Sequence, residues 1–259
     1  MTTDPEEPGA SPAADRLLEV LQFLAAQRGP VPAAVVSREL ALPRSTVYQL
    51  LRSLRRRGFA AHFPEARRYG LGLSAFELSS AYLRQAPLGR LGAPLLAALA
   101  DQVGQSAHLA VLHGRDVIYL VEERAPHRPT LVTDVGVRLP AHLTATGRSM
   151  LAELSAPQLR ALYAAPAAFE TRTGVGPRRY RELREVLAQV RAAGYGFEDG
   201  EVTEGIASVA VSFTDRSGWP RAAIGVSLPA VSLESAAAAT LADRLRPYAE
   251  ELARRLGAR

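Results

Sequence analysis

Apolar residues recur at helical spacing in three runs near the N-terminus, and each run ends at a helix breaker. The first run, Leu17–Leu24, predicts a helix of about 14 residues that ends at Gly29. The second run predicts a short helix over Pro32–Leu40, with the proline in its first turn. The third predicts a helix from about Arg44 to Arg57 that ends at Gly58, a residue suited to a left-handed cap.

The third helix has one apolar face and one face of arginines and hydrogen-bonding side chains. Its apolar residues follow the i, i+3, i+4, i+7 pattern of a helix packed on a core: Val47, Leu50, Leu51 and Leu54. A rotation of about 100° per residue places a second group opposite them. This group consists of Ser45, Gln49, Arg52 and Arg56, with Tyr48 and Arg55 at its sides. It contains no carboxylate, unlike an ordinary solvated face of alternating charge.

Two short extended runs around a turn follow the third helix. Residues 59–63 and 67–71 flank Pro64-Glu65-Ala66, which predicts a β-hairpin wing. Arg67 and Arg68 begin the second strand, and we expect both to lie on DNA phosphate. The helices and hairpin together predict a winged helix-turn-helix.

The placement of arginine points to nucleic acid. The formal net charge is +5, the isoelectric point is near 9.9, and arginine is used to the exclusion of lysine. Seven arginines and a single acid, Glu65, lie between residues 42 and 68, which is the electrostatic footprint of a nucleic-acid-binding surface. The second helix of a helix-turn-helix enters the major groove, where arginine bonds guanine and glutamine bonds adenine.

Double-stranded DNA is therefore the favoured partner of this surface. The expected DNA contacts are Arg44, Ser45, Thr46, Tyr48, Gln49, Arg52, Arg56, Arg67 and Arg68. Two rival interpretations stay open. One is a membrane-surface amphipathic helix, although the apolar face is narrow for that role. The other is a winged helix that docks on protein.

From Leu73 onward the pattern alternates between helices and strands. The segment LSAFELSSAYLRQ predicts a helix that joins two domains, and a further helix from Leu88 ends near Gly104. SAHLAVLH and DVIYLVEE, separated by a Gly-Arg turn, predict a hairpin. The other expected strands are 130–135, 206–214 and 221–228, and the other expected helices are 146–153, 157–163, 179–193 and a long helix from about 233. This order favours an α+β domain with an antiparallel sheet flanked by helices.

The sequence contains few of the residues and motifs that catalysis requires. It has no cysteine and no G-x-S-x-G, H-E-x-x-H or P-loop motif. His108 and His113 point to opposite faces of one expected strand, and His142 is interpreted as structural. A group of four carboxylates is interpreted as an acidic surface loop, with a ligand or metal site as the open alternative: Glu198, Asp199, Glu201 and Glu204. We expect no catalytic residue, no metal and no cofactor.

The N-terminal stretch is acidic and rich in proline. Residues 1–14 lack the basic start and apolar run of a signal peptide, and we expect them to form a disordered tail. The chain also lacks the run of about 18 apolar residues that a membrane span requires. These features favour a cytoplasmic protein with no membrane contact.

Three segments carry a resemblance to a known family: LPRSTVYQLLRSLRRRGF, LPAHLTATGRSML and AAGYGFEDGEVTEGIASVAVSFTDRSGWPRAAIGVSLP. Their order and spacing resemble the IclR family of bacterial transcription regulators, from about residue 15 to the C-terminus. The resemblance implies a winged helix-turn-helix at 15–72, a linker helix at 73–87 and a GAF-like effector-binding domain at 88–259. It also implies a homodimer or a dimer of dimers on a palindromic operator, with a small organic or aromatic acid as the effector.

The resemblance further implies an effector pocket. The matching motif positions are Ala145, Thr146, Glu198 or Asp199, Ile206, Ser208, Gly225 and Ser227. Position 208 is often cysteine in the family and is serine here. Position 225 is serine in some members that hold small carboxylates and is glycine here. A serine hydroxyl can bond a carboxylate oxygen, and the glycine is expected to leave room for a larger ligand.

The sequence thus predicts a ligand-responsive, DNA-binding transcription regulator that is not an enzyme. Two alternatives from other classes stay open. One is a hydrolase or lyase with an accessory winged-helix domain. The other is a winged-helix scaffold that binds only protein.

Overall fold

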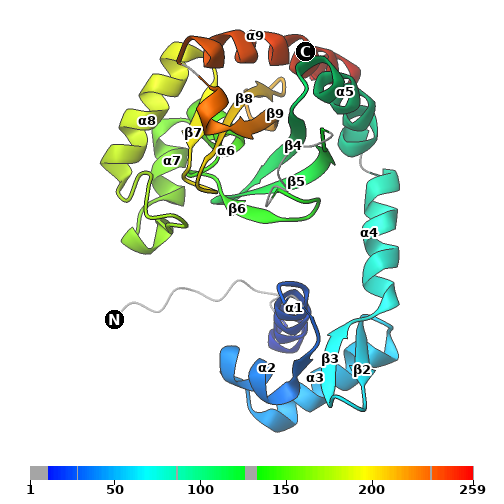
Figure 1. Ribbon diagram of the computed structural model, residues 1–259. Coiled ribbons are helices and arrows are strands. Elements are labelled where there is room, and N and C mark those ends of the chain that lie inside the picture. The colour runs from blue at the N-terminus through cyan, green and yellow to red at the C-terminus, as the bar shows by residue number, and fades with distance from the viewer. Residues whose placement is uncertain (1–10, 28, 86, 126–132, 234, 259) are drawn as a thin grey trace. The chain divides into compact units, whose positions relative to one another are not determined.

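The computed structural model describes residues 11–27, 29–85, 87–125, 133–233 and 235–258. The chain forms two compact units, Met1–Gln85 and Ala86–Arg259 (Figure 1). Within the described ranges, no helix is long and apolar enough to cross a lipid bilayer.

The first unit consists of short helices around a small antiparallel sheet. Its elements are α1 (Pro12–Ala25), β1 (Val31–Pro32), α2 (Ala33–Glu39), α3 (Arg44–Arg56), β2 (Ala60–Phe63), β3 (Arg68–Leu71) and α4 (Leu73–Gln85). The strands pair in the order β1-β3-β2. The predicted helices and the hairpin β2-β3 are confirmed. Strand β1 was not predicted, because its partner β3 lies far along the chain and local periodicity does not reveal such pairing.

The core of this unit fixes the orientation of α3. Its fully buried apolar side chains come from three helices: Val20, Leu24, Val36, Val47, Leu51 and Leu54. The tight turn between α2 and α3 includes Ala41 at a φ of 52°, and Ser37 Oγ donates to Leu42 O at 2.6 Å. After α3, Gly58 adopts a φ of 76°, and a Cβ there would lie 2.5 Å from Ser74 Oγ. Glycine therefore lets the chain reverse into β2.

The prediction that residues 1–14 form a disordered tail is wrong for the last residues of this stretch. Residues 1–10 lie outside the described ranges, but Pro12–Ala14 form the first turn of α1. Proline is tolerated at the start of a helix, alanine is the best helix former, and Asp15 places a negative charge near the positive end of the helix dipole. These local preferences outweigh the proline-rich composition of the stretch.

The second unit is built around a six-stranded antiparallel sheet. Its helices are α5 (Pro87–Val103), α6 (Ala145–Glu153), α7 (Ala156–Leu162), α8 (Tyr180–Ala193) and α9 (Ser235–Arg255). Its strands are β4 (Ser106–His113), β5 (Asp116–Glu123), β6 (Arg138–Pro140), β7 (Gly196–Asp199), β8 (Ile206–Thr214) and β9 (Pro220–Pro229). The sheet order is β6-β5-β4-β9-β8-β7. The α+β class and the antiparallel sheet flanked by helices are therefore confirmed.

Helices cover both faces of this sheet (Figure 1). Helices α5 and α9 pack on one face, where alternate residues such as Leu109, Val209 and Ile224 form an entirely apolar core. Helices α6, α7 and α8 lie on the other face, whose core includes Tyr119 and Met150. Along β4, β8 and β9 this second face also carries buried polar side chains, which mark it as the functional face.

Two strand predictions in the second unit need correction. Of the expected strand 130–135, residues 130–132 lie outside the described ranges and 133–135 are not a strand. Gly136, at a φ of 82°, instead forms a turn that leads into β6. Strand β7 was not predicted, because its four residues were interpreted as part of an acidic loop. In the structure they alternate, with Gly196 and Glu198 buried and Phe197 and Asp199 exposed.

Candidate functional site

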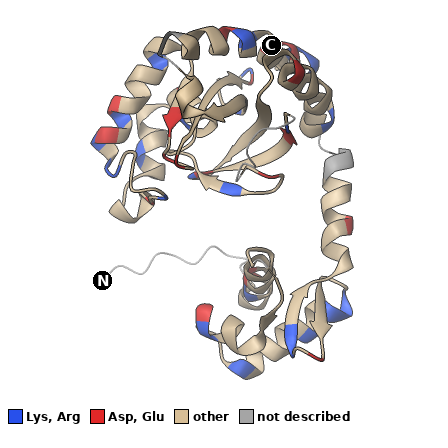
Figure 2. Cartoon of the chain, viewed as in Figure 1, with Lys and Arg blue, Asp and Glu red and all other residues tan. Residues whose placement is uncertain are grey.

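The outward face of α3 is exposed and rich in arginine. Arg44, Gln49 and Arg52 are exposed on this helix, whereas Val47 and Leu51 on its opposite face are buried. The remaining predicted contacts on α3 are also accessible: Ser45, Tyr48 and Arg56 are exposed, and Thr46 is half-buried. Figure 2 shows these basic residues in the first unit. The face presents donors for base edges and charges for phosphate.

The hairpin β2-β3 adds two exposed arginines. Arg67 lies in its turn at a φ of 50°, and Arg68 begins β3. Arg68 Nη1 also donates to Pro30 O at 3.3 Å, which directs this side chain toward the start of β1. Among the described residues, no carboxylate lies within ion-pair distance of the seven arginines of α3, its C-terminal end and the hairpin: Arg44, Arg52, Arg55, Arg56, Arg57, Arg67 and Arg68. Their charge is therefore available to a partner.

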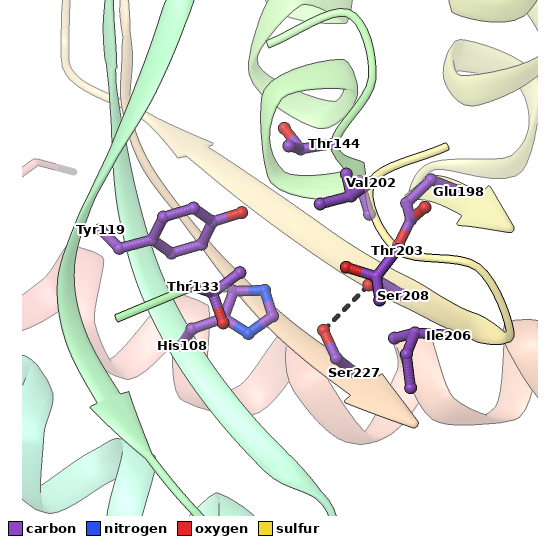
Figure 3. Close-up of a pocket in the computed structure, with 11 residues that line it drawn as sticks. His108, Tyr119, Thr133, Thr144, Glu198, Val202, Thr203, Ile206, Ser208 and Ser227 are labelled. Atoms are coloured by element: carbon purple, nitrogen blue, oxygen red, sulfur yellow. Dashed lines mark hydrogen bonds between the residues drawn. The ribbon is translucent and has the colours of Figure 1, made fainter. Parts of the chain in front are cut away.

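The second unit contains a small cavity of about 20 Å³ between the sheet and the N-terminus of α6 (Figure 3). This space holds about one water molecule, so a larger ligand would enter only if the surrounding side chains moved apart. The cavity is lined by His108, Tyr119, Thr133, Thr144, Ala145, Glu198, Val202, Thr203, Ile206, Ser208 and Ser227. It therefore combines apolar walls with hydroxyls, an imidazole and one carboxyl group.

Sheet register brings the polar lining together. Glu198 of β7 pairs with Ser208 of β8, which pairs with Ser227 of β9. In the neighbouring row His108 of β4 pairs with Gly225 of β9. Because side chains alternate along a strand, all of these residues point to the face covered by α6.

Three of these residues form a buried hydrogen-bonded chain. Ser208 Oγ donates to Glu198 Oε1 at 2.6 Å, and the Oγ atoms of Ser208 and Ser227 are 2.9 Å apart (Figure 3). Burial raises the pKa of Glu198 to about 7, and the hydroxyl of Ser208 partly offsets this by stabilising the carboxylate. The cavity therefore contains a carboxyl group that titrates near neutral pH.

The opposite side of the cavity is uncharged. Burial lowers the pKa of His108 to about 4, so its imidazole is neutral at pH 7, and burial raises the pKa of Tyr119. Tyr119 Oη lies 3.5 Å from Thr146 Oγ1. Ala145 lines the cavity in the first turn of α6, where the first N–H groups have no partner within the helix and can bind an anion.

Five of the predicted pocket positions line this cavity: Ala145, Glu198, Ile206, Ser208 and Ser227. Thr146 is not among the lining residues, but its Oγ1 lies 3.5 Å from Oη of Tyr119, which is. Asp199 is exposed on the other face of β7 and so points away from the cavity. Six further residues line the cavity and were not predicted from the sequence: His108, Tyr119, Thr133, Thr144, Val202 and Thr203. Alternation along β4 was a usable signal for His108, since it separates this residue from the exposed His113.

The prediction that Gly225 leaves room for a larger ligand is wrong. A Cβ at position 225 would lie 2.4 Å from His108 Nε2 and 3.0 Å from Thr146 Cγ2. The imidazole of His108 therefore fills the space that a serine side chain would need. Glycine at 225 makes room for a protein side chain and not for ligand.

The acidic segment is only partly a surface loop. Asp199 and Glu204 are exposed, but Glu198 is buried and Glu201 forms an ion pair of 2.7 Å with the buried Arg148. Arg148 also donates to His142 O at 2.9 Å and to Phe197 O at 2.6 Å. These bonds hold β7, and hence Glu198, against α6. Among the described residues no group of three or more His, Asp or Glu could hold a metal ion.

His142 has the environment of a structural residue. Its Nε2 lies 3.0 Å from Glu170 O, and its ring packs edge-on against Tyr163 and Phe169. It lies outside the cavity lining.

A winged helix-turn-helix and a domain with a small internal cavity define the class of ligand-responsive DNA-binding proteins. The sequence profile of the IclR helix-turn-helix domain matches residues 13–62, and that of the bacterial transcriptional regulator IclR C-terminal domain matches residues 80–254. The second match spans more than half of the chain. The chain therefore belongs to the IclR family of bacterial transcription regulators.

Individual relatives agree with this assignment. The Pca regulon regulatory protein of Pseudomonas putida is 33% identical over 82% of this chain and 72% of its own. The transcriptional repressor IclR of Escherichia coli (strain K12) is 30% identical over 83% of this chain and 78% of its own. An IclR homologue of Microbacterium hydrocarbonoxydans, solved with 4-hydroxybenzoate, has the same fold, with a TM-score of 0.76 and 22% identity over 93% of this chain and 97% of that one.

Proposed function

We propose that this transcription regulator binds a palindromic operator through α3 and changes its operator affinity when a small organic or aromatic acid enters the cavity of the second unit. The observation that carries the DNA part is the exposed face of α3, where the arginines have no carboxylate partner among the described residues. We further propose that the protein acts in the cytoplasm and catalyses no reaction. Its relatives are named as regulators, which supports that view.

The division of roles on the DNA follows from position. Gln49 and Arg52 lie on the exposed side of the recognition helix and would read base edges in the major groove. Arg67 and Arg68 lie on the hairpin and would contact phosphate, which supplies affinity and register but no sequence information. A protein-docking winged helix would not need such a concentration of unpaired cations.

The chemistry of the cavity lining suits a small acid with an apolar body and a polar end. The cavity of about 20 Å³ would have to widen to admit a single ring, and an extended ligand would require a still larger change. The first N–H groups of α6 supply donors for a carboxylate. The structural relative solved with 4-hydroxybenzoate has the same fold, which supports an acid of this size.

Helix α4 supports a homodimer or a dimer of dimers. Four large apolar side chains of this helix are exposed: Leu73, Phe76, Leu78 and Tyr82. Exposed apolar surface of this kind usually marks a protein contact. A two-fold assembly would place two copies of α3 on the two halves of an inverted repeat.

A mobility-shift assay with the DNA that flanks the protein's own gene tests the proposed function. We expect the full chain to shift one fragment in the presence of excess nonspecific competitor, and to lose affinity when either half of its inverted repeat is scrambled. Equal affinity for all fragments would contradict sequence-specific binding through α3 and would favour the protein-binding scaffold. Turnover of a metabolite by the purified chain would instead favour the accessory-domain enzyme.

A further inference from the structure

The cavity contains a chain of hydrogen bonds in which the donors and acceptors can exchange roles. Glu198, Ser208 and Ser227 stand opposite one another on β7, β8 and β9, and all three line the cavity (Figure 3). The Ser208–Glu198 bond is 2.6 Å and the Ser208–Ser227 bond is 2.9 Å. In the second bond, either hydroxyl can be the donor.

The protonation state of Glu198 sets this direction. A carboxylate only accepts hydrogen bonds, and each serine hydroxyl has one proton to donate. When Glu198 is ionised, Ser208 donates to Glu198, so Ser227 must donate to Ser208. Both hydroxyl protons are then used inside the chain, and Ser227 offers only lone pairs to a ligand. A ligand carboxylate would meet an acceptor there.

A proton on Glu198 removes this conflict. The carboxyl group can then donate to Ser208, Ser208 to Ser227, and Ser227 to an oxygen of the ligand. We propose that the cavity binds its organic acid as an anion together with one proton, which Glu198 holds. The proton comes from solvent and forms an O–H bond on Glu198, and no other covalent bond changes. This inference rests on the proposed function, since it concerns the same ligand site.

The surroundings of Glu198 offer no compensating charge for a second anion. Among the described residues, no arginine lines the cavity. Arg148 of α6 faces the β7 region, but its guanidinium is engaged by Glu201 and by two backbone carbonyl groups. His108 of β4 is neutral because burial lowers its pKa to about 4, and Tyr119 of β5 is neutral because burial raises its pKa. Two carboxylates in this volume would repel each other.

Glu198 is positioned to take up the proton. The residue is 2% exposed, and its Oε2 has no hydrogen-bond partner among the described residues. The neighbouring Glu201 carboxylate adds to the effect of burial, while Arg148 and the Ser208 hydroxyl oppose it, and the resulting pKa is about 7. Below this pH the empty site already carries the proton. Above it, an anion must bring a proton with it, so anion affinity falls as pH rises.

Benzoate and benzamide are a matched pair of probes for this coupling, because they have nearly the same shape and differ in charge. Binding of each to the full chain would be measured by calorimetry from about pH 6 to about pH 8.5, in buffers of different ionisation enthalpy. For benzoate we expect Kd to rise by up to about tenfold per pH unit above pH 7, with proton uptake approaching one per ligand. For benzamide we expect neither effect. Benzoate binding without pH dependence or proton uptake would overturn the inference.

Two variants test whether Glu198 holds the proton that is taken up with the anion. Glu198→Gln keeps a donor toward Ser208 at every pH, so benzoate affinity should become independent of pH and exceed that of the wild type at about pH 8. Asp199→Asn is the control, because it removes a carboxylate from the exposed face of the same strand and should keep the wild-type pH profile. A wild-type slope in Glu198→Gln would overturn the assignment to Glu198. If this variant does not fold, the wild-type proton count still decides the matter.

The same data separate failure of the inference from failure of the proposed function. Benzoate binding that is abolished by Ser227→Leu but does not depend on pH leaves the ligand site in place and overturns only the proton coupling. Absence of any Ser227→Leu-sensitive binding by either probe counts against the ligand site, and the coupling fails with it.

Discussion

At the scale of single residues, α3 separates the side chains that build the core from those that can read DNA. Val47 and Leu51 are buried, whereas Gln49 and Arg52 are exposed on the opposite face. Arg67 lies apart from them on the hairpin. In the proposed function Gln49 and Arg52 read base edges and Arg67 contacts phosphate, so substitutions at these positions should have different signatures.

Arg52→Ala is expected to relax sequence preference and to weaken operator binding by about 1–3 kcal/mol, because a bidentate contact to guanine is lost. Fluorescence anisotropy against the operator and single-base variants of it measures both effects. Arg181→Ala is a matched control, since it removes an exposed arginine from α8 in the second unit. Unchanged operator affinity in Arg52→Ala would show that α3 is not the recognition helix.

Arg67→Ala is expected to weaken binding to all DNA sequences about equally. One fewer phosphate contact releases one fewer counterion, so the slope of log affinity against log salt should become less steep by about 1. Titrations of operator and random DNA at several salt concentrations provide the test. A loss confined to the operator would instead make Arg67 a base-reading residue.

Gly225→Ala is expected to destabilise the second unit by about 1–3 kcal/mol, because the added Cβ overpacks the site beside His108 Nε2 and Thr146. Chemical denaturation measures the change in free energy of unfolding. The same substitution should cost less in a His108→Ala background, since the two side chains compete for one space. Equal costs in both backgrounds would contradict this packing explanation.

Single positions also show what the sequence could not reveal. Helical spacing was enough to separate the buried Leu51 from the exposed Arg52. It could not place His108 beside Gly225, because that contact depends on the pairing of β4 with β9. Likewise Tyr119 and Thr133 join the cavity only through tertiary packing. The family resemblance supplied five of the lining positions but left these neighbours unidentified.

At the scale of elements, the long strands of the second unit were predicted, whereas some short strands were missed. The hairpin of β4 and β5 and the long strands β8 and β9 were predicted, because their alternation continues over eight or more residues. Strand β1 has two residues, which are too few for periodicity to distinguish a strand from a loop, whereas β7 ends in two carboxylates that led to its interpretation as part of an acidic loop. Strand β1 is defined by its pairing with the distant β3, and β7 by its pairing with β8, the next strand along the chain. The missed β7 is the element that brings Glu198 into the cavity.

Helix α4 gives a prediction about assembly. Phe76→Glu is expected to weaken self-association and thereby operator binding, because it places a charge among the exposed apolar residues of α4. Sedimentation at micromolar concentration measures the assembly. Ser79→Glu is the control, since it adds the same charge at an exposed polar position of the same helix. A wild-type monomer that still binds its operator would contradict the dimer.

At the scale of the whole molecule, the proposed function requires coupling between the two units. The DNA-binding face belongs to Met1–Gln85 and the cavity to Ala86–Arg259. A ligand changes operator affinity only if it binds the DNA-competent and DNA-incompetent conformations unequally. Typical coupling energies of about 1–3 kcal/mol correspond to roughly 5–150-fold changes in affinity. The size of the change, measured at saturating ligand, is therefore the quantity that reports regulation.

The most direct test is operator affinity with and without ligand, measured for the wild type and for Ser227→Leu alongside their melting temperatures. The ligand is the small aromatic acid that most raises the melting temperature of the wild type. We predict a change of at least about fivefold in the wild type. Ser227 lies 5% exposed in the cavity wall, so leucine there should fill the cavity and abolish the response while ligand-free operator binding is kept. Equal affinities with and without ligand in the wild type, or a parallel loss of DNA binding and melting temperature in Ser227→Leu, would contradict the account.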